Sequence, residues 1–355
     1  MFKDLSPTVV FTDASFQEFG DRKGYLLSQV PYHRSKRFLF HYLLGRIPEW
    51  RGNFSKFWLK QNLKEQFDAV YSFVYSAICL EYGWWISKIL QGKHITHIAD
   101  HSNDFTENEK WKRIISDSDG CATIGNNMRD EYEKVFSNTP FEIIHNGIDY
   151  ENLPFSPHQY GIFSEKMPFK VLFLGSLFKH LHKDGIQDIC TAIKELYLDG
   201  HPIHFHLYGQ LVPENVIDDF LGFENIEHKG IINPANRFEL MREYHCIVVP
   251  STFEPDLAKA YSYSIPTKLT EVLSSGRPVL VYGPEIMESY RFCKKNASGK
   301  TITTRSVKKL KEYFLDLIKG YSEKVKESSE GALRVIEDHS GHIVRNKLLE
   351  FLNRV

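Results

Sequence analysis

Residues 262–280 read SYSIPTKLTEVLSSGRPVL, and this stretch decides how the second half of the chain is interpreted. Apolar residues recur at helical spacing from Thr267 to a stop at Gly276, and the Thr267 hydroxyl is suited to an N-cap. The N–H groups at a helix N-terminus favour phosphate, and Lys268 would add a charge beside them. Glu271 lies one turn further on, where its carboxylate could accept hydrogen bonds from a ribose diol. A capped amphipathic helix with solvated Lys and Glu side chains explains the same pattern equally well.

Outward from this stretch, short apolar runs that end at Gly or Pro alternate with segments of helical spacing. This order predicts a parallel sheet with helices on both faces. In the second half the pattern predicts strands over 170–174, 203–208, 246–249 and 278–282, and helices over 186–197, 238–244 and 267–275. In the first half it predicts strands over 9–12, 69–74, 97–100, 122–125 and 142–145, and helices over 77–90 and 126–136. From Ser306 onward the chain is expected to be mostly helical.

The spacing of Pro and Gly residues divides the chain. The segment 152–168 has the composition of an interdomain linker. We therefore expect an N-terminal α/β domain over 1–155, a C-terminal α/β domain over 166–330, and a terminal helix over 331–355 that packs back on the first domain. Ligands of open α/β sheets bind at the carboxyl ends of the strands, so the functional residues should follow strands directly.

Composition excludes several classes of protein. The chain has 355 residues, 42% of them hydrophobic, and a net charge of −1, which argues against a globally basic nucleic-acid-binding protein. Its five cysteines form no C-x-x-C pair, so neither a disulfide framework nor a zinc site is predicted, and free thiols suit the cytoplasm. The most apolar stretch, 69–90, contains Glu81 and Lys88 and is read as a strand and a buried helix rather than a membrane span.

An ordered set of short motifs over about 95–300 resembles the large retaining glycosyltransferase family 4, in the variant found in surface-polysaccharide enzymes. The motifs are ATIGNNM at 122–128, IIHNGID at 143–149, VLFLGSL at 171–177, HLYG at 206–209, HKGII at 228–232, VVPS at 248–251 and IPTKLTEVLSSGRPV at 265–279. The resemblance implies the GT-B fold, in which two Rossmann-like α/β domains face a central cleft. It also implies a nucleotide diphosphate sugar as donor substrate, with no other cofactor and no metal.

The resemblance assigns roles to individual residues. Glu271 would bind the donor ribose, and Lys183, in Lys183-Asp184-Gly185, would bind the diphosphate. The backbone of Ile231 or Ile232 would contact the nucleobase. His101, which follows a strand of the first domain, would contact the sugar; a surface histidine beside a helix start is the alternative reading. The donor site would be completed by the glycine turn and the diphosphate loop, at Gly175, Ser176, Ser264, Thr267, Lys268 and Leu269.

The chain departs from the family pattern at several positions. Tyr263 stands where many members have the first of two glutamates, and Glu254 lies too far back to be equated with it. Ser176 stands where many members have an arginine, for which Lys179 or Arg277 are the substitutes to consider. The segment 14–20 is not Gly-rich, and we expect the first strand–helix unit of the N-terminal domain to be missing or remodelled, which would affect acceptor binding and catalysis.

Basic and aromatic residues alternate over 34–64. This mixture suits an anionic membrane surface, and it also suits single-stranded nucleic acid or a half-buried amphipathic face. Because many members of the family act on lipid-linked acceptors, the resemblance favours the membrane over nucleic acid.

These observations predict a hexosyltransferase-type glycosyltransferase that transfers a sugar to a hydroxyl acceptor with retained configuration. Its acceptor would be a saccharide or lipid-linked saccharide of bacterial surface polysaccharide or lipopolysaccharide synthesis, and its place the cytoplasm or the inner face of the membrane. A nucleotide-sugar epimerase of the same fold and a non-catalytic nucleotide-sugar-binding paralogue are the alternatives.

Overall fold

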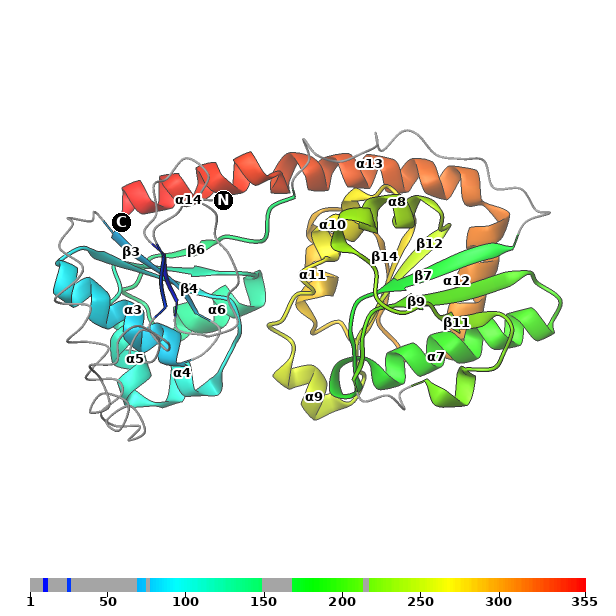
Figure 1. Ribbon diagram of the computed structural model, residues 1–355, viewed down its shortest axis with the longest axis horizontal. Coiled ribbons are helices and arrows are strands. Elements are labelled where there is room, and N and C mark those ends of the chain that lie inside the picture. Colours follow the sequence, from blue (N-terminus) through cyan, green and yellow to red (C-terminus); the bar gives the residue numbers. More distant parts are fainter. Residues whose placement is uncertain (1–8, 12–23, 27–68, 75–76, 149–167, 213–216) are drawn as a thin grey trace, which may run out of the picture. The chain divides into compact units, whose positions relative to one another are not determined.

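The computed structural model describes residues 9–11, 24–26, 69–74, 77–148, 168–212 and 217–355 (Figure 1). Contacts divide the chain into two units. The first comprises 1–124, 128–144 and 347–355, and the second comprises 125–127 and 145–346. The interdomain linker 152–168, the segment 14–20 and the basic aromatic segment 34–64 lie wholly or almost wholly outside the described residues.

The first unit contains a four-stranded parallel sheet of order β3-β4-β5-β6. Its strands are β3 (Ala69–Val74), β4 (Lys93–Ile98), β5 (Gly120–Thr123) and β6 (Phe141–Ile143). Its helices are α3 (Ala77–Leu90), α4 (Asn103–Glu107), α5 (Glu109–Ser116) and α6 (Asn126–Val135). A separate parallel pair is formed by β1 (Val9–Phe11) and β2 (Gly24–Leu26). The predicted strand 69–74 and helix 77–90 are confirmed with these bounds.

The prediction of a strand over 97–100 is wrong, because β4 ends at Ile98 and begins four residues earlier than expected. This strand contains several polar residues, so it is not a continuous run of apolar residues and its start was not predicted. His94 is buried and exchanges hydrogen bonds with the Ser72 hydroxyl (3.0 Å) and the Ser118 hydroxyl (3.2 Å). Thr96 is also buried, and its hydroxyl bonds to Ser118 at 2.8 Å. Burial of polar groups is tolerated where each finds a partner, so the strand is interior despite its composition.

The second unit contains a six-stranded parallel sheet of order β11-β9-β7-β12-β13-β14. Its strands are β7 (Phe169–Leu174), β9 (Ile203–Tyr208), β11 (Ile226–His228), β12 (Cys246–Pro250), β13 (Val279–Tyr282) and β14 (Lys300–Ile302). The pair β8 (Leu177–Phe178) and β10 (Leu211–Val212) extends the ends of β7 and β9. The four strands predicted in this half are present.

The helices of the second unit follow the strands in the order expected of an α/β domain. They are α7 (Lys179–Leu198), α8 (Arg237–Arg242), α9 (Pro255–Ala260), α10 (Leu269–Ser274), α11 (Glu288–Lys295), α12 (Val307–Lys319) and α13 (Tyr321–His339), and α14 (Gly341–Arg354) continues into the first unit. Figure 1 shows α8 and α10 on the opposite side of this sheet from α7.

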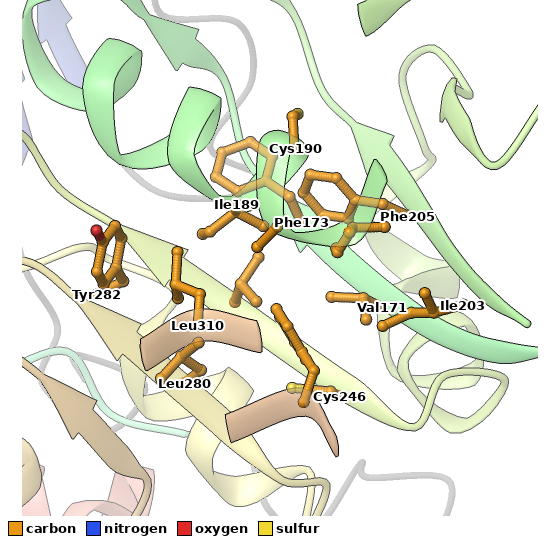
Figure 2. Close-up of a cluster of buried hydrophobic side chains, with 14 of the residues drawn as sticks. Val171, Phe173, Ile189, Cys190, Ile203, Phe205, Cys246, Leu280, Tyr282 and Leu310 are labelled. Carbon is orange, nitrogen blue, oxygen red and sulfur yellow. The ribbon is translucent and has the colours of Figure 1, made fainter. Parts of the chain in front are cut away.

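Alternate residues of β7 and β9 fill the core between the sheet and α7. Val171, Phe173 and Phe205 pack there against Ile189 of α7 and Leu310 of α12 (Figure 2). Alternation is the rule in a strand because successive side chains point to opposite faces of the sheet. Burial of such apolar surface is the main favourable contribution to folding of this unit.

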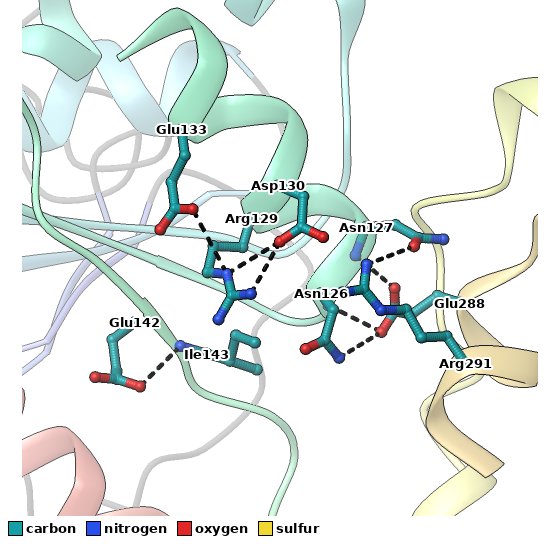
Figure 3. Close-up of polar contacts among 9 residues, drawn as sticks. All are labelled: Asn126, Asn127, Arg129, Asp130, Glu133, Glu142, Ile143, Glu288 and Arg291. Carbon is teal, nitrogen blue, oxygen red and sulfur yellow. Dashed lines mark hydrogen bonds and ion pairs between the residues drawn. The ribbon is translucent and has the colours of Figure 1, made fainter. Parts of the chain in front are cut away.

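The buried carboxylate of Glu288 binds the first residues of α6, which belong by their contacts to the second unit. Glu288, which is fully buried at the start of α11, accepts hydrogen bonds from the backbone N–H groups of Asn126 (2.8 Å) and Asn127 (2.6 Å) (Figure 3). The side-chain amide of Asn126 donates to the same carboxylate at 3.1 Å. A Cβ at Gly125 would lie 2.7 Å from this carboxyl carbon. The motif ATIGNNM therefore has a structural reason: glycine admits the carboxylate, which caps the helix that follows.

Candidate functional site

Three neighbouring strands of the second unit end in a glycine with positive φ. Gly175 follows β7, Gly209 follows β9, and Gly230 lies just beyond β11, with φ of 156°, 139° and 81°. Hydrogen bonds join the turns, since the Gly209 N–H donates to the Gly230 carbonyl at 2.9 Å and the Gly175 N–H donates to the Tyr208 carbonyl at 2.9 Å. A Cβ at Gly209 would lie 1.9 Å from the Gly175 carbonyl oxygen, so only glycine fits there. At these three turns the backbone carries no side chain, so a ligand can approach the backbone closely at this edge of the sheet.

The segment Lys183-Asp184-Gly185 lies in the first two turns of α7 and ties this helix to the loop after β12. A Cβ at Gly185 would lie 2.4 Å from the Ser251 carbonyl oxygen, so the helix and the loop touch through backbone alone. The Asp184 carboxylate accepts the Phe253 N–H at 2.5 Å. Lys183 takes no part in these contacts and is exposed. Lys183 follows the carboxyl end of β7, and its ammonium group has no carboxylate partner among the described residues.

Glu271 lies in the first turn of α10, and its carboxylate forms an ion pair with Arg237 of α8 (2.9 Å). The Glu271 side chain is 22% exposed and that of Arg237 is 29% exposed, so the pair is accessible from one side. A charge-assisted hydrogen bond of this kind orients the carboxylate. Arg237 is absent from the residues expected on sequence grounds, because 34 positions separate it from Glu271 and no local pattern connects them.

The loop before α10 differs from the sequence prediction. The helix begins at Leu269 instead of Thr267, and Lys268 occupies the N-cap position without a side-chain hydrogen bond. The Leu269 N–H donates to the Pro266 carbonyl at 2.8 Å, and the Ser264 N–H donates to the Tyr261 carbonyl at 3.0 Å. A turn from Pro266 to Leu269 therefore replaces the expected first turn of helix. The amides of Ser264 and Leu269 are already paired, and the Leu269 side chain is fully buried.

The loop after β11 carries the two residues expected near a nucleobase. Ile231 is 79% exposed and Ile232 is half-buried. Ser176, the position at which an arginine is common in the resembled family, follows the Gly175 turn and is half-buried.

Arg277 does not substitute for that arginine. Its guanidinium is buried and donates to the Tyr321 hydroxyl (3.1 Å) and to the Arg242 carbonyl. Arg277 therefore links its own loop to α8 and α13 and stabilises the packing of the second unit. Glu254, the other acidic residue considered on sequence grounds, is the N-cap of α9, where its carboxylate accepts the Leu257 N–H at 2.8 Å.

His101 belongs to the first unit, at the carboxyl end of β4. Its Nε2 lies 3.0 Å from the Asn103 Oδ1, and its ring packs edge-on against Tyr132, with 5.7 Å between centroids. Burial lowers the pKa of this imidazole, so it is neutral at pH 7 and Nε2–H donates to Asn103. The contact with Asn103 beside the start of α4 agrees with the alternative reading of a histidine at a helix start.

The structure thus brings Gly175, Lys183, Ile231 and Glu271 to one edge of the second unit's sheet, because the carboxyl ends of parallel strands share an edge. Within the described part of the chain, no helix is both long and apolar enough to cross a membrane. The same residues contain no cluster of three His, Cys, Asp or Glu side chains able to hold a metal ion.

Comparisons with known proteins concern the family and the fold. Residues 168–319 match the family model described as Glycosyl transferases group 1. No curated protein matches the chain in sequence. Among solved structures, Anabaena Alr3699/HepE in complex with UDP and glucose has a TM-score of 0.63 at 14% identity, over 88% of this chain and 83% of that one.

Two further structures are similar. The apo form of the lipopolysaccharide outer core galactosyltransferase WaaB has a TM-score of 0.57 at 13% identity, over 87% of this chain and 82% of that one. A point mutant of S. aureus TarM in complex with fondaparinux, alpha-GlcNAc-glycerol and UDP has a TM-score of 0.54 at 15% identity, over 75% of this chain. This chain spans only 53% of the TarM structure. The fold shared with these structures is GT-B, as the sequence motifs predict.

Proposed function

We propose that this chain, a glycosyltransferase of the GT-B fold whose group 1 domain spans residues 168–319, transfers a hexose from a nucleoside diphosphate sugar to a hydroxyl of a saccharide acceptor. The observation that carries the proposal is the carboxyl edge of the second unit's sheet, which carries glycine turns, an exposed lysine and a glutamate oriented by an arginine. This combination suits a donor that has a diphosphate and a ribose diol.

In the proposed donor complex, Glu271 accepts hydrogen bonds from the ribose hydroxyls, and the backbone of Ile231 or Ile232 contacts the base. Lys183 lies beside the diphosphate, together with the glycine turn at Gly175 and Ser176. The Ser264–Leu269 loop closes the diphosphate site through Thr267 and Lys268, since the amides of Ser264 and Leu269 are already bonded within the loop.

In the proposed reaction, the acceptor oxygen bonds to the anomeric carbon as the bond from that carbon to the phosphate oxygen breaks. The electron pair stays on the leaving diphosphate, whose developing charge Lys183 stabilises. The acceptor oxygen approaches the face of the anomeric carbon from which the phosphate departs, so the configuration is retained. The departing phosphate oxygen takes the acceptor proton, so no dedicated base is required. His101, a neutral imidazole in the first unit, is proposed to contact the sugar hydroxyls.

We propose a role in assembly of a bacterial surface polysaccharide or lipopolysaccharide. The proposal is supported by similarity to the outer core galactosyltransferase WaaB and to TarM. In this role the segment 34–64 would hold the enzyme at the inner face of the membrane. Flotation of the full chain with vesicles tests this: we expect binding to vesicles containing phosphatidylglycerol that about 0.5 M salt releases, and none to phosphatidylcholine alone. Equal binding to both would contradict it.

The donor site is tested by thermal shift of the purified full chain with UDP, GDP, ADP, CMP and dTDP. A ligand that binds only the folded state raises Tm by mass action, so one nucleotide should give a clear shift. Incubation with the corresponding nucleotide sugars then distinguishes the activities. Transfer to an acceptor releases nucleoside diphosphate, an epimerase interconverts the sugar without releasing it, and a binding paralogue does neither. No shift with any nucleotide would contradict the proposed donor site.

A further inference from the structure

Three aromatic rings outside the donor residues named above lie side by side at the carboxyl edge of the second unit. Phe178 and His180 are 5.8 Å apart between ring centroids with planes at 37°, and His180 and Tyr261 are 5.4 Å apart with planes at 32°. Both contacts are tilted, and through His180 they join the three rings into one continuous aromatic cluster. We call Phe178, His180 and Tyr261 the aromatic strip.

One ring of the strip, Phe178, is supported by His182 and through it by the core of the unit. Phe178 stacks on the ring of His182, with planes at 27°, and His182 packs edge-on against the buried Phe173. The Phe178 N–H also donates to Nδ1 of His182 at 3.2 Å. Burial lowers the pKa of His182 to about 4, so Nδ1 remains an acceptor at neutral pH. A ring supported in this way loses little entropy when it binds a ligand.

The outer side of the strip is available to a ligand. Phe178 is 36% exposed, His180 is exposed and Tyr261 is half-buried. Among the described residues, neither the His180 imidazole nor the Tyr261 hydroxyl has a hydrogen-bond partner. The strip therefore combines an apolar aromatic surface with two polar groups along it.

His180 lies three positions before Lys183 on α7, and residues at this spacing are neighbours on a helix surface. The strip thus begins beside the proposed diphosphate lysine. A pyranose ring has apolar C–H faces and a rim of hydroxyls, which match an aromatic surface with polar groups at its side. We propose that the aromatic strip is a subsite that stacks a hexopyranose ring of a saccharide substrate, and this rests on the proposed function.

Ligand-observed saturation-transfer NMR of the full chain tests the subsite. The probes are the methyl α-pyranosides of glucose, galactose and mannose, with the nucleotide site occupied by UDP. For at least one probe, we expect Phe178→Leu and Tyr261→Leu to weaken binding by roughly fivefold to tenfold, the loss of one aromatic stacking contact. Phe178→Trp should retain binding, because it keeps a ring. Leu198→Ala, at the far end of α7 where Leu198 is 68% exposed, is the matched control and should bind as the parent does.

Replacing UDP by UDP-glucose, UDP-galactose and UDP-N-acetylglucosamine shows whether the pyranose ring that binds the strip belongs to the donor or to the acceptor. Loss of the pyranoside signal assigns the strip to the transferred sugar, and persistence assigns it to the acceptor. Absence of any pyranoside signal in the parent, or equal signals in Phe178→Leu, would overturn the proposal. So would a roughly tenfold loss of UDP affinity in Phe178→Leu with unchanged pyranoside binding, which would mean that the strip stacks the base. Failure of the proposed function appears separately, as a parent chain that binds no nucleotide.

Discussion

At the scale of single residues, the candidate site depends on how charged side chains are held. The Glu271 carboxylate and the Arg237 guanidinium orient each other while both stay partly exposed. Lys183 has no such partner among the described residues, because the neighbouring Asp184 is engaged with the Phe253 N–H. The difference suits the two proposed roles: a ribose diol needs an oriented acceptor, whereas a diphosphate needs available positive charge.

Replacing Glu271 by Ala should weaken binding of the cognate nucleoside diphosphate by roughly 1–3 kcal/mol, the range for a hydrogen bond to a charged group. Isothermal titration calorimetry of the parent and the variant measures this difference. Glu239→Ala, at an exposed carboxylate on α8, is a matched control and should leave affinity unchanged. Equal affinity in the parent and in the Glu271 variant would contradict the assigned role.

At the scale of elements, two glycines and one carboxylate determine how helices meet loops. Gly185 allows the start of α7 to contact the carbonyl of Ser251, and Gly209 allows the turns after β7 and β9 to meet. Glu288 supplies to α6 the capping oxygens that the helix would otherwise take from its own N-cap side chain or from water.

Gly185→Ala should displace the start of α7 from the loop after β12, since the added Cβ would lie 2.4 Å from a backbone oxygen. We expect a loss of stability of about 1–3 kcal/mol, the usual cost of overpacking, together with weaker nucleotide binding through displacement of Lys183. Urea unfolding and calorimetry measure the two effects. Gly320→Ala is the control, because its nearest contact is an ordinary 3.4 Å to the Asp316 carbonyl. Full stability in Gly185→Ala would show that the contact is not required.

Glu288→Ala should destabilise the protein by about 2–4 kcal/mol, because it leaves two backbone N–H groups at the start of α6 without their charged acceptor. Glu288→Gln should cost less, since its amide oxygen still accepts one of these hydrogen bonds. Differential scanning calorimetry of both variants gives the order of stability. Glu285→Ala, three residues earlier and exposed, should match the parent. A Glu288→Ala variant as stable as Glu285→Ala would refute the capping role.

At the scale of the whole molecule, buried and half-buried imidazoles couple stability to pH. Burial lowers the pKa of His94, His182 and His245 to about 4. The charges of Arg277 and Lys170 contribute to the shift of His245, whose Nδ1 accepts the Lys170 N–H at 2.8 Å. Protonation of these rings is therefore easier in the unfolded chain than in the folded protein.

Stability contributed by these three histidines should be complete above the unfolded pKa of about 6.5 and should fall as pH decreases toward 4. The loss is at most about 1.4 kcal/mol per pH unit for each histidine. Urea unfolding at pH 7, 6 and 5 measures the slope, and His245→Gln, which can still accept the Lys170 N–H without titrating, should make it shallower. A constant free energy of unfolding from pH 7 to 5 would rule out this linkage.

Much of this protein could be predicted from its sequence, because parallel-sheet strands are short apolar runs and helices have a regular period. The strand 203–208 and the helix 77–90 appear with their expected bounds, and the motifs predict the GT-B fold. Local signals failed where polar groups are buried in pairs, as in β4. They also failed where a turn replaces a helix start, as before Leu269.

Only the tertiary structure decided which distant residues meet. Arg237 pairs with Glu271 across 34 positions, Glu288 caps α6 across 162, and Phe178, His180 and Tyr261 form one surface from two separate segments. The local sequence around each of these residues does not indicate which distant residue it contacts. A periodic pattern records which face of an element is buried. The Arg237–Glu271 pair and the aromatic strip depend instead on the strand order of the six-stranded sheet, which brings loops far apart in the chain to a common edge.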